Sequence, residues 1–586
     1  MTALAAALTG WAGAVAAAQV TLDVTMLAAG SRADLVLRLA DPATGWPLDG
    51  LSLRAWLRAP LAAGESCTDA VTRLATSRPD PRHALALDGF RLLILGEDGT
   101  VAGLDPRLDL ASANLVHIQG LGGMPVDLLP DPPRGLLWAS LGDALIRRDL
   151  AAADPDLRLP LPGRPGSLAG PGPQGEILVG LDEEGAVALL ASDGAQIARQ
   201  AVGQGPIDLA TGAGRTLALS RGDGRLLLLE ATTLERRGEV ALGMPAAALA
   251  LDERQDLGLV LAGSRLLVVA LEVPRLLQAI ELGIGADRLA LTPDGRWALA
   301  LDRQRSVLAV VDLARGRLAH ALEFSEGAEE LLVGADLLYL RLRDAPAMAI
   351  LPLAALAGAD PPPVEKVVMG AAATGGVGRR LMALGPSGRE VWLAHPADRT
   401  AYLFTGGSMR APVTAVPIKG AAPAGLLIQP LAPQPLGGGA YAASLRAPGA
   451  GRYALMVLPD RPPDPSCLEL AVTGTSATSA VSLVAPPRLL ARLAGPVDAQ
   501  GAATVSLEAR QGGVPAGLDG PVIVRALQMG ASWQQRIEAE PTAEARWSAR
   551  LRFPAAGRYL MLAEAPGAGL ALADGPRLVI DVGAAP

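Results

Sequence analysis

The chain has 586 residues, of which 50% are apolar and only 3% aromatic, and its formal net charge is −8. This length exceeds one ordinary hydrophobic core, so we expect several domains, or one large repeat domain with smaller satellites. Charges of both signs are dispersed along the chain, which leaves no basic stripe and argues against nucleic-acid binding.

The first 18 residues form an apolar, small-residue stretch that ends in Ala16-Ala17-Ala18, just before Gln19. This ending fits the cleavage rule of a secretory signal peptide, although the usual basic start is missing. The alternative is an N-terminal helix packed on the body of the protein. No later apolar run reaches the ~18 residues of a membrane span. We therefore expect no membrane span and a periplasmic or secreted protein.

Residues 19–66 alternate apolar and polar side chains between turns, as antiparallel strands do. They resemble the first half of a β-sandwich that stops too early to close. The other half is predicted in residues 437–474, because GAYAASLRAPGAGRYALMVL (439–458) repeats in ARWSARLRFPAAGRYLML (545–562). The later copy belongs to a contiguous second sandwich in residues 502–586, and residues 475–501 are predicted to be a linker.

Everything between the two halves is then an insertion, which is tolerated where the ends of the inserted domain lie close together. The chain has two cysteines, and this arrangement places both Cys67 and Cys467 in the interrupted sandwich. In an exported protein such a pair is a candidate disulfide. Two buried free thiols are the alternative. The segment around Cys67 is predicted to be a short capped helix that links host and insert.

Residues 82–435 are predicted to be a β-propeller. Residues 206–327 repeat one pattern three times, with a period of about 40 residues, and each copy has four apolar runs separated by turns. Eight innermost strands are predicted to begin near Met124, Gly166, Pro206, Ala246, Asp287, Ala328, Arg380 and Pro423. Joining the last to the three unpartnered strands after His83 closes the ring. We expect eight blades; seven is the alternative, because Pro361–Pro363 interrupt one of them.

The blade sequence LALTPDGRWALALDRQRSVLAVVDLARGRLAHALE (289–323) resembles bacterial YVTN-type repeats and the related cytochrome d1-like propellers. Its P-D-G turn has a physical basis, because proline fixes φ and Asp-Gly suits a tight reversal. The sandwich modules resemble, more loosely, immunoglobulin-type domains of exported copper- and oxidase-associated proteins. The fold class is therefore all-β: a propeller inserted into a discontinuous immunoglobulin-like sandwich, followed by a second sandwich.

The resemblance to cytochrome d1 propellers implies a haem whose iron takes a histidine, so the four histidines are the test. His117 and His320 fall in outer-strand stretches and His83 lies at the junction of host and insert. His395, between two strands of a late blade, is the weak candidate for binding a cofactor in the central cavity. A haem or metal site normally needs several convergent groups, so no cofactor or metal is predicted.

Other motifs are absent or lack context. The sequence has no C-x-x-C-H, no zinc or copper spacing and no G-x-S-x-G. The glycines at 375–378 lack the P-loop lysine and are predicted to form a loop. The carboxylates at 182–184, Glu326 and Glu329-Glu330 are predicted to be solvated turn charges.

Three functions remain open, and catalytic residues are unknown in all of them; the one with the least support is a hydrolase or lyase that acts in the central cavity. The first is an exported, non-catalytic propeller that acts as a binding or scaffold protein for periplasmic proteins, including as an accessory to an electron-transfer system. The second, which rests on the resemblance alone, is a redox protein of the cytochrome d1-like or quinoprotein class with a cofactor in the propeller.

Overall fold

In the computed structural model, nearly all regular secondary structure is β-strand. The structure describes residues 19–583 apart from 25–31, 42–43, 77–83, 108–113, 151–155, 173, 213, 407–410, 462–463, 474–487, 512–513, 519, 530–532, 566–567, 569, 571 and 573–574. The predicted signal peptide (1–18) and His83 lie outside the described residues. In the part that is described, one α-helix occurs, α1 (Cys67–Thr76), with two 3-10 turns, η1 (Pro132–Arg134) and η2 (Leu353–Ala357).

Most of the chain forms four-stranded antiparallel sheets whose strands follow one another in sequence. The first four are β8 (Asp127–Asp131), β9 (Leu136–Ser140), β10 (Ala144–Asp149), β11 (Leu157–Pro160); β12 (Pro165–Ala169), β13 (Ile177–Leu181), β14 (Ala186–Leu190), β15 (Gln196–Ala201); β16 (Ile207–Gly212), β17 (Arg215–Ser220), β18 (Arg225–Glu230), β19 (Arg236–Ala241); β20 (Ala246–Asp252), β21 (Leu257–Ala262), β22 (Arg265–Ala270), β23 (Arg275–Glu281). The next three are β24 (Arg288–Leu291), β25 (Trp297–Asp302), β26 (Val307–Asp312), β27 (Arg317–Glu323); β28 (Ala328–Val333), β29 (Leu337–Leu342), β30 (Ala347–Pro352), β31 (Glu365–Val368); β32 (Met382–Leu384), β33 (Glu390–His395), β34 (Thr400–Thr405), β35 (Thr414–Pro417).

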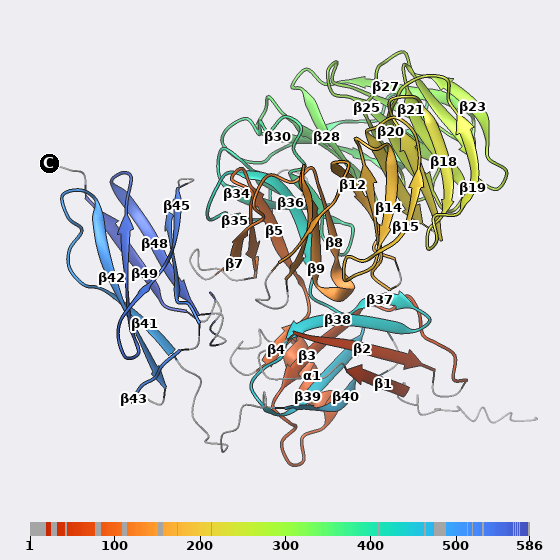
Figure 1. Cartoon of the computed structure of the whole chain (residues 1–586). Coiled ribbons are helices and arrows are strands. Elements are labelled where there is room, and N and C mark those ends of the chain that lie inside the picture. Colours follow the sequence, from red (N-terminus) through yellow and green to blue (C-terminus); the bar gives the residue numbers. More distant parts are fainter. Residues whose placement is uncertain are drawn as a thin grey trace, which may run out of the picture. The chain divides into compact units, whose positions relative to one another are not determined.

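The eighth sheet joins distant parts of the sequence. Its innermost strand, β36 (Pro423–Pro430), comes after all the others, and it is followed in the sheet by β5 (Phe90–Gly96), β6 (Thr100–Leu104) and β7 (Leu115–Gly120). Figure 1 shows teal β36 beside brown β5. The innermost strands β8, β12, β16, β20, β24, β28 and β32 contact one another in this order. The sheets thus follow one another around a β-propeller, and the pairing of β36 with β5 closes the ring.

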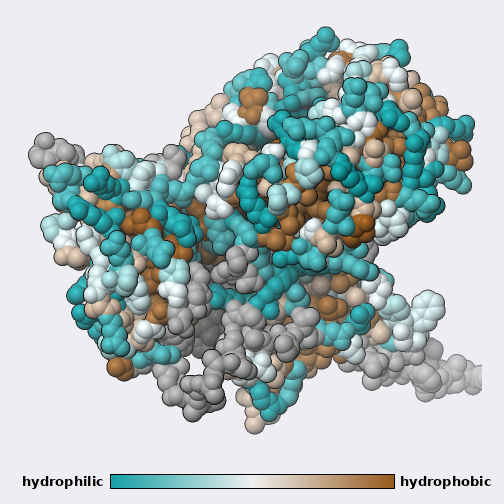
Figure 2. All heavy atoms as spheres, viewed as in Figure 1, coloured by the Kyte–Doolittle hydropathy of each residue, from teal (hydrophilic) through white to brown (hydrophobic). Residues whose placement is uncertain are grey.

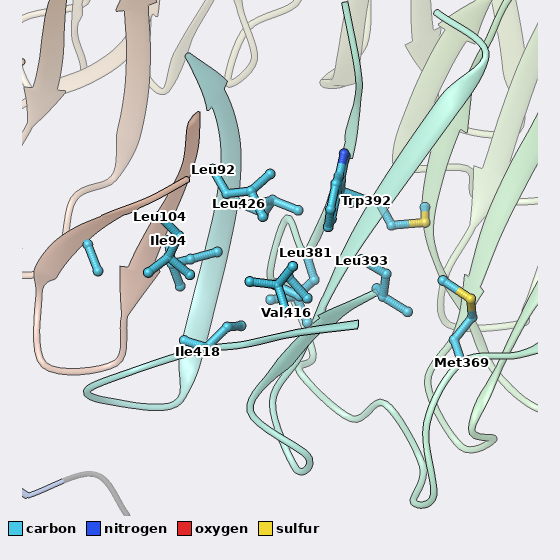
Figure 3. Close-up of a cluster of buried hydrophobic side chains, with 14 of the residues drawn as sticks. Leu92, Ile94, Leu104, Met369, Leu381, Trp392, Leu393, Val416, Ile418 and Leu426 are labelled. Atoms are coloured by element: carbon cyan, nitrogen blue, oxygen red, sulfur yellow. The ribbon is translucent and has the colours of Figure 1, made fainter. Parts of the chain in front are cut away.

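Apolar side chains between neighbouring sheets hold the ring together. The second strand of a sheet is covered on both faces, as in β25, where every residue is buried, so its sequence is a continuous apolar run rather than an alternating one. Figure 3 shows one such layer, in which Leu92 and Leu426 meet Trp392 and Val416 of the preceding sheet. The Pro361–Pro363 excursion precedes β31 and leaves that sheet with four strands.

The two ends of the insert are flanked by strands that pair with each other. One sheet has the order β1 (Gln19–Val24), β2 (Arg32–Ala40), β38 (Ala440–Arg446), β37 (Gln434–Gly437). A second has the order β4 (Ala84–Leu87), β3 (Leu53–Arg58), β39 (Gly451–Pro459), β40 (Ser466–Val472). Leu35, Leu37 and Leu455 belong to the apolar cluster between these sheets. We call this pair of sheets the split sandwich.

Strand boundaries differ from the sequence prediction at three places. β4 was expected inside the propeller, because its ALAL sequence reads like a blade strand, but it pairs with β3 of the split sandwich. Helix α1 therefore precedes a strand of the host instead of linking host to insert. At the other end β37 begins at Gln434, before the predicted boundary, and pairs with β38.

The C-terminal residues form two further sheets. Their orders are β41 (Arg488–Leu493), β42 (Ala502–Gln511), β47 (Arg546–Arg552), β46 (Glu540–Ala543) with β43 (Val514–Pro515) beside β42, and β45 (Gln534–Glu538), β44 (Ile523–Gln528), β48 (Gly557–Glu564), β49 (Arg577–Val582). We call this pair the C-terminal sandwich. β41 lies in the stretch predicted to be linker, so the module begins earlier than expected.

The split sandwich carries the cystine of the chain. Cys67 of α1 and Cys467 of β40 are bonded, with Cα atoms 5.8 Å apart. Helix α1 begins where the Ser66 hydroxyl accepts a hydrogen bond from the Asp69 amide at 3.1 Å, which is a helix N-cap. Its buried residues Ala70 and Val71 belong to the cluster that includes Trp56 and Met456. The bond thus joins the parts of the sandwich that precede and follow the insert.

Candidate functional site

His395, the weak cofactor candidate, is wholly buried at the end of β33. Its Nδ1 accepts a hydrogen bond from the Asp398 amide at 3.1 Å, and its Nε2 lies 2.9 Å from the Ala372 carbonyl oxygen. Because a carbonyl oxygen only accepts, Nε2 is the donor of this hydrogen bond. Both nitrogens are engaged in holding turns together, so neither is presented to a ligand.

The other described histidines are also packed inside blades. His320 is buried with Nε2 3.2 Å from the Leu356 carbonyl oxygen. His117 lies against Gly103, where a Cβ would come within 2.2 Å of the ring, and burial lowers the pKa of His117 to about 3. None of these three lines the cavities described below. The described histidines therefore do not fit the axial ligand of a haem in this channel.

The glycine-rich loop at 375–378 surrounds a buried guanidinium. Arg341 of β29 is fully buried, and its Nη2 donates to the carbonyl oxygens of Gly376 at 2.9 Å and Arg379 at 3.3 Å. Gly375 and Gly376 have φ values of 57° and 66°, in the left-handed region that glycine adopts without strain. The glycines let the backbone curl around Arg341. The loop therefore serves to enclose this guanidinium, which accounts for its glycines without phosphate binding.

Glu330 completes this network and fixes the start of β32. Its carboxylate accepts from Arg341 Nε at 3.1 Å and from the amides of Leu381 at 2.8 Å and Met382 at 3.0 Å. Burial raises the pKa of Glu330, and the Arg341 guanidinium opposes that rise. The prediction of a solvated turn charge was wrong for Glu330, because its partner eleven residues later draws it into the wall of the ring.

Glu329 is likewise buried, at 3% exposure, and was also wrongly predicted to be solvated. It accepts from Arg303 Nη1 at 2.9 Å and from the Gly378 amide at 2.7 Å. Asp182 accepts from the Ile207 amide of the next sheet at 2.9 Å. Glu326 forms an ion pair with Lys366 that lowers the pKa of the glutamate. These carboxylates join neighbouring segments of the ring.

Two adjoining cavities open at the end of the ring where the innermost strands begin. One, of about 520 Å³, reaches Asp127, Leu128 and Glu97, and the other, of about 390 Å³, reaches Arg288, Arg303 and Leu331. Both are lined by Gly378, Arg379, Arg380, Leu426 and Leu427. The end of the glycine loop thus lies between the two cavities.

Four arginines form what we call the rim of these cavities: Arg288, Arg303, Arg379 and Arg380. Arg303 is held by Asp287 and Glu329, with Nε 2.8 Å from Asp287 Oδ2 and Nη1 2.9 Å from Glu329 Oε1. Arg379 lies 2.6 Å from Glu97 Oε1 and donates to the Pro423 carbonyl oxygen at 3.2 Å. These two arginines are therefore well compensated.

The positive charges of Arg288 and Arg380 are less fully neutralised by acidic partners. Asp287 Oδ2 is 3.7 Å from Arg288, and the same carboxylate is already bound by Arg303. Arg380 is 80% exposed, with one contact of 3.3 Å to Asp127. Burial lowers the pKa of Arg288, and the positive charge of Arg303 lowers it further. The positive charge of the rim is thus concentrated on these two residues.

Two acidic groups interact with this region: Asp127, which contacts Arg380, and Asp208, whose pKa responds to the charge of Asp127. Asp127 accepts from the Leu168 amide of the next sheet at 3.0 Å. Burial raises the pKa of Asp208, with the charges of Asp182 and Asp127 adding to the rise and Arg221 opposing it. Both carboxylates already have partners, since Asp127 is bonded to Arg380 and the Leu168 amide and Asp208 lies near Arg221.

The sequence interpretation missed Arg288, Arg303, Arg379 and Arg380. A signal for part of this set was present, since Asp127, Asp208 and Arg288 each directly precede a leucine at the start of an innermost strand. The three residues hold the corresponding place in the sheets of β8, β16 and β24, and two of them, Asp127 and Arg288, line the cavities. Within the described residues no group of three His, Cys, Asp or Glu side chains is placed to hold a metal. No helix of that part is long and apolar enough to cross a membrane.

Comparison with known proteins gives likeness in structure only. No known protein family and no curated protein sequence matches the chain. Among solved structures, dihydro-heme d1 dehydrogenase NirN is 16% identical with a TM-score of 0.48, over 60% of this chain and 78% of NirN. Apo AztD from Citrobacter koseri is 12% identical with a TM-score of 0.46, over 58% of this chain and 98% of AztD. The Cps50 (Swd1) beta-propeller domain from Myceliophteria thermophila is 13% identical with a TM-score of 0.32, over 43% and 88% of the two chains.

Proposed function

We propose that this chain is an exported, non-catalytic binding protein: an eight-bladed propeller inserted into an immunoglobulin-like sandwich and followed by a second one. In this proposal the rim recognises periplasmic proteins. The observation that supports it is the Arg341–Glu330 network, which fixes the backbone on both sides of Arg379 and Arg380. A recognition surface held rigid before binding loses less conformational entropy on association.

Two tyrosines support the immunoglobulin-like assignment of both sandwiches. Tyr453 donates to the Gly449 carbonyl oxygen at 2.7 Å, and Tyr559 donates to the Ala555 carbonyl oxygen at 2.7 Å. A tyrosine whose hydroxyl bonds the backbone a few residues upstream is a recurring corner of immunoglobulin-type sandwiches. The two tyrosines occupy matching places at the start of β39 and β48.

The test is a rim-dependent capture experiment in the native host. Tagged wild-type protein, Arg379→Glu/Arg380→Glu, and the control Arg315→Glu are cross-linked in the periplasm and their partners are quantified. Arg315 is 58% exposed in an ion pair with Asp312, so like Arg380 it is an exposed arginine beside an aspartate, but it lies outside both cavities. We expect a partner shared by wild type and control and lost from the rim variant, because reversed charge repels a complementary surface. A partner set identical in all three would contradict the proposal.

Export and cofactor content are measured on the same material. We expect the purified native protein to begin at Gln19 by intact mass, and to fractionate with the periplasm. A redox role would need an iron ligand in the channel, and none of His117, His320 and His395 lines either cavity. The native protein should therefore lack a haem absorption band, and a stoichiometric haem band would overturn the non-catalytic assignment in favour of the redox alternative.

A further inference from the structure

The smaller cavity combines a charged opening with apolar walls. Besides Arg288 and Arg380 it is lined by Leu331, Leu332, Leu384 and Ile428, four side chains that are only partly buried. Its volume of about 390 Å³ falls within the range of small-molecule sites, about 300–1,000 Å³. Partly exposed leucines inside a concave surface are favourable contacts for an apolar ligand, because covering them removes apolar area from water.

The sheets place these apolar side chains on innermost strands rather than on turns. Leu331 pairs with Leu340 and Leu384 with Val391, each within its own antiparallel ladder. Their backbones are therefore fixed, and the walls belong to rigid elements. Hydrophobic and hydrophilic residues are interspersed on the face shown in Figure 2. That face therefore offers no obvious site for an apolar ligand.

The charge at the opening selects the sign of the ligand. Arg288 shares the Asp287 carboxylate with Arg303, and Arg380 is largely exposed beside Asp127. The Asp287 carboxylate is shared between Arg288 and Arg303, so it neutralises Arg288 only in part. An anionic group placed between Arg288 and Arg380 would supply the missing negative charge. Guanidinium groups bind carboxylates and phosphates through paired N–H donors. Glu329 and Glu330 also line the cavity, but their carboxylates are bonded to arginines and backbone amides. A cationic head group is therefore disfavoured, because it would meet Arg288 and Arg380.

We propose that this cavity binds an amphipathic organic anion, with its oxyanion head at Arg288 and Arg380 and its apolar body against the leucine walls. The inference rests on the proposed function, that the chain is a binding protein, and names a ligand class for it. An inorganic oxyanion would leave the apolar walls uncovered. A neutral apolar molecule would bury the two arginines with only the shared Asp287 carboxylate and Asp127 as counter-charges, which is costly.

The experiment is isothermal titration calorimetry on the full-length mature protein with butanoate, hexanoate and octanoate, and with octan-1-ol, octyl phosphate and inorganic phosphate as comparison probes. Affinity is expected to rise about fourfold for each added methylene, the value for burying one CH₂ group. Octan-1-ol and inorganic phosphate should each bind at least about tenfold more weakly than octanoate, since each lacks one half of the recognition. Octyl phosphate binding tighter than octanoate would identify a phosphate head, and the reverse a carboxylate head.

Variants locate the site. Arg288→Gln and Arg380→Gln should each weaken octanoate binding about tenfold, because each removes a charged donor. Leu331→Ala should reduce the gain per methylene while leaving butanoate affinity unchanged. Arg315→Gln should behave as wild type, and matching thermal unfolding midpoints would establish that all variants are folded.

Two results overturn the inference: octanoate that does not bind wild type, or octanoate binding that Arg288→Gln and Arg380→Gln leave intact. Failure here is distinguishable from failure of the proposed function. Rim-dependent capture of a protein partner without octanoate binding would contradict only the proposal that the cavity binds an amphipathic anion. Octanoate binding without any captured partner would remove the role in partner recognition and keep the cavity as a small-molecule site.

Discussion

The split sandwich and the C-terminal sandwich have the same strand order in both sheets. β1-β2-β38-β37 corresponds to β41-β42-β47-β46, and β4-β3-β39-β40 corresponds to β45-β44-β48-β49. Helix α1 lies between β3 and β4 of the split sandwich, and a second connection differs more. β45 and β46 are separated only by Ala539, whereas between β4 and β37 the chain forms the whole propeller. The insertion therefore occupies the place of one crossover between sheets.

The location of that crossover explains how the host tolerates its insert. β4 and β37 are the edge strands of their sheets, so the chain leaves and re-enters without interrupting an internal ladder. β2 still pairs with β38 over Arg32–Arg38, and β3 still pairs with β39. A propeller suits such a place because its first and last strands share one sheet and its ends are close together.

The two cores also correspond residue by residue. Ala33 pairs with Leu445 as Ala503 pairs with Leu551. By the same register Leu37 pairs with Tyr441, and its counterpart Leu507 pairs with Trp547. The difference lies in the partners, since Tyr441 is fully buried and its hydroxyl donates to the Leu48 carbonyl oxygen at 2.9 Å.

The largest effect is expected from emptying the matched core positions. Leu37→Ala and Leu507→Ala should each reduce the free energy of unfolding of their own sandwich by about 2–5 kcal/mol, the cost of a buried leucine and its cavity. Leu37→Ala should be the more costly, because the bonded hydroxyl keeps Tyr441 from collapsing into the space. Hydrogen–deuterium exchange checks this by peptide, with faster exchange in β38 for Leu37→Ala and in β47 for Leu507→Ala.

Exchange in the other sandwich is the internal control for each variant. If Leu37→Ala accelerated exchange in β47 as much as in β38, the two modules would unfold as one unit. The correspondence of their strands would then describe a shared shape without independent stability.

The second largest effect is expected from removing the Cys67–Cys467 disulfide of the split sandwich, which has no counterpart in the C-terminal sandwich. Cys67→Ser/Cys467→Ser should destabilise the split sandwich by about 2–4 kcal/mol, because the unfolded host is no longer joined across the insert. The loss of stability is measured by chemical denaturation monitored through hydrogen–deuterium exchange in β39 and β48. Exchange in β48 should be unaffected. An unchanged β39 would mean that strand pairing alone keeps the two parts of the host together.

The regular part of this fold follows from the sequence because each blade repeats a local pattern. In residues 206–327 apolar runs alternate with turns at a fixed period, so strand positions are set by nearby residues. β4 and β41 could not be assigned in this way. Their assignment depends on partners, β3 and β42, and short sequences such as ALAL suit a blade or a sandwich equally.

The candidate site was less accessible to sequence reasoning for a similar reason. Arg288 and Arg380 are 92 positions apart in the numbering and meet only because the ring brings the starts of innermost strands to one opening. The burial of Glu330 depends on Arg341 and on amides of the next sheet. Histidine is rare in this chain, which made His395 a candidate ligand, but both of its ring nitrogens are hydrogen-bonded to nearby backbone groups. Residue type indicates chemistry only after the hydrogen bonds are known.

The smallest effect is expected at the two corner tyrosines. Tyr453→Phe and Tyr559→Phe each remove one hydrogen bond of 2.7 Å to a carbonyl oxygen and should cost about 1 kcal/mol. Tyr559 is fully buried and packs against Phe553 at 4.5 Å between ring centroids, whereas Tyr453 is partly exposed and its bond competes with water. Tyr559→Phe should therefore be the more destabilising, measured as the shift in denaturation midpoint of its own sandwich. Equal shifts would indicate that both corners are equally shielded, and a larger shift for Tyr453→Phe would show that the hydroxyl carries more of the stability of the interrupted module than its burial indicates.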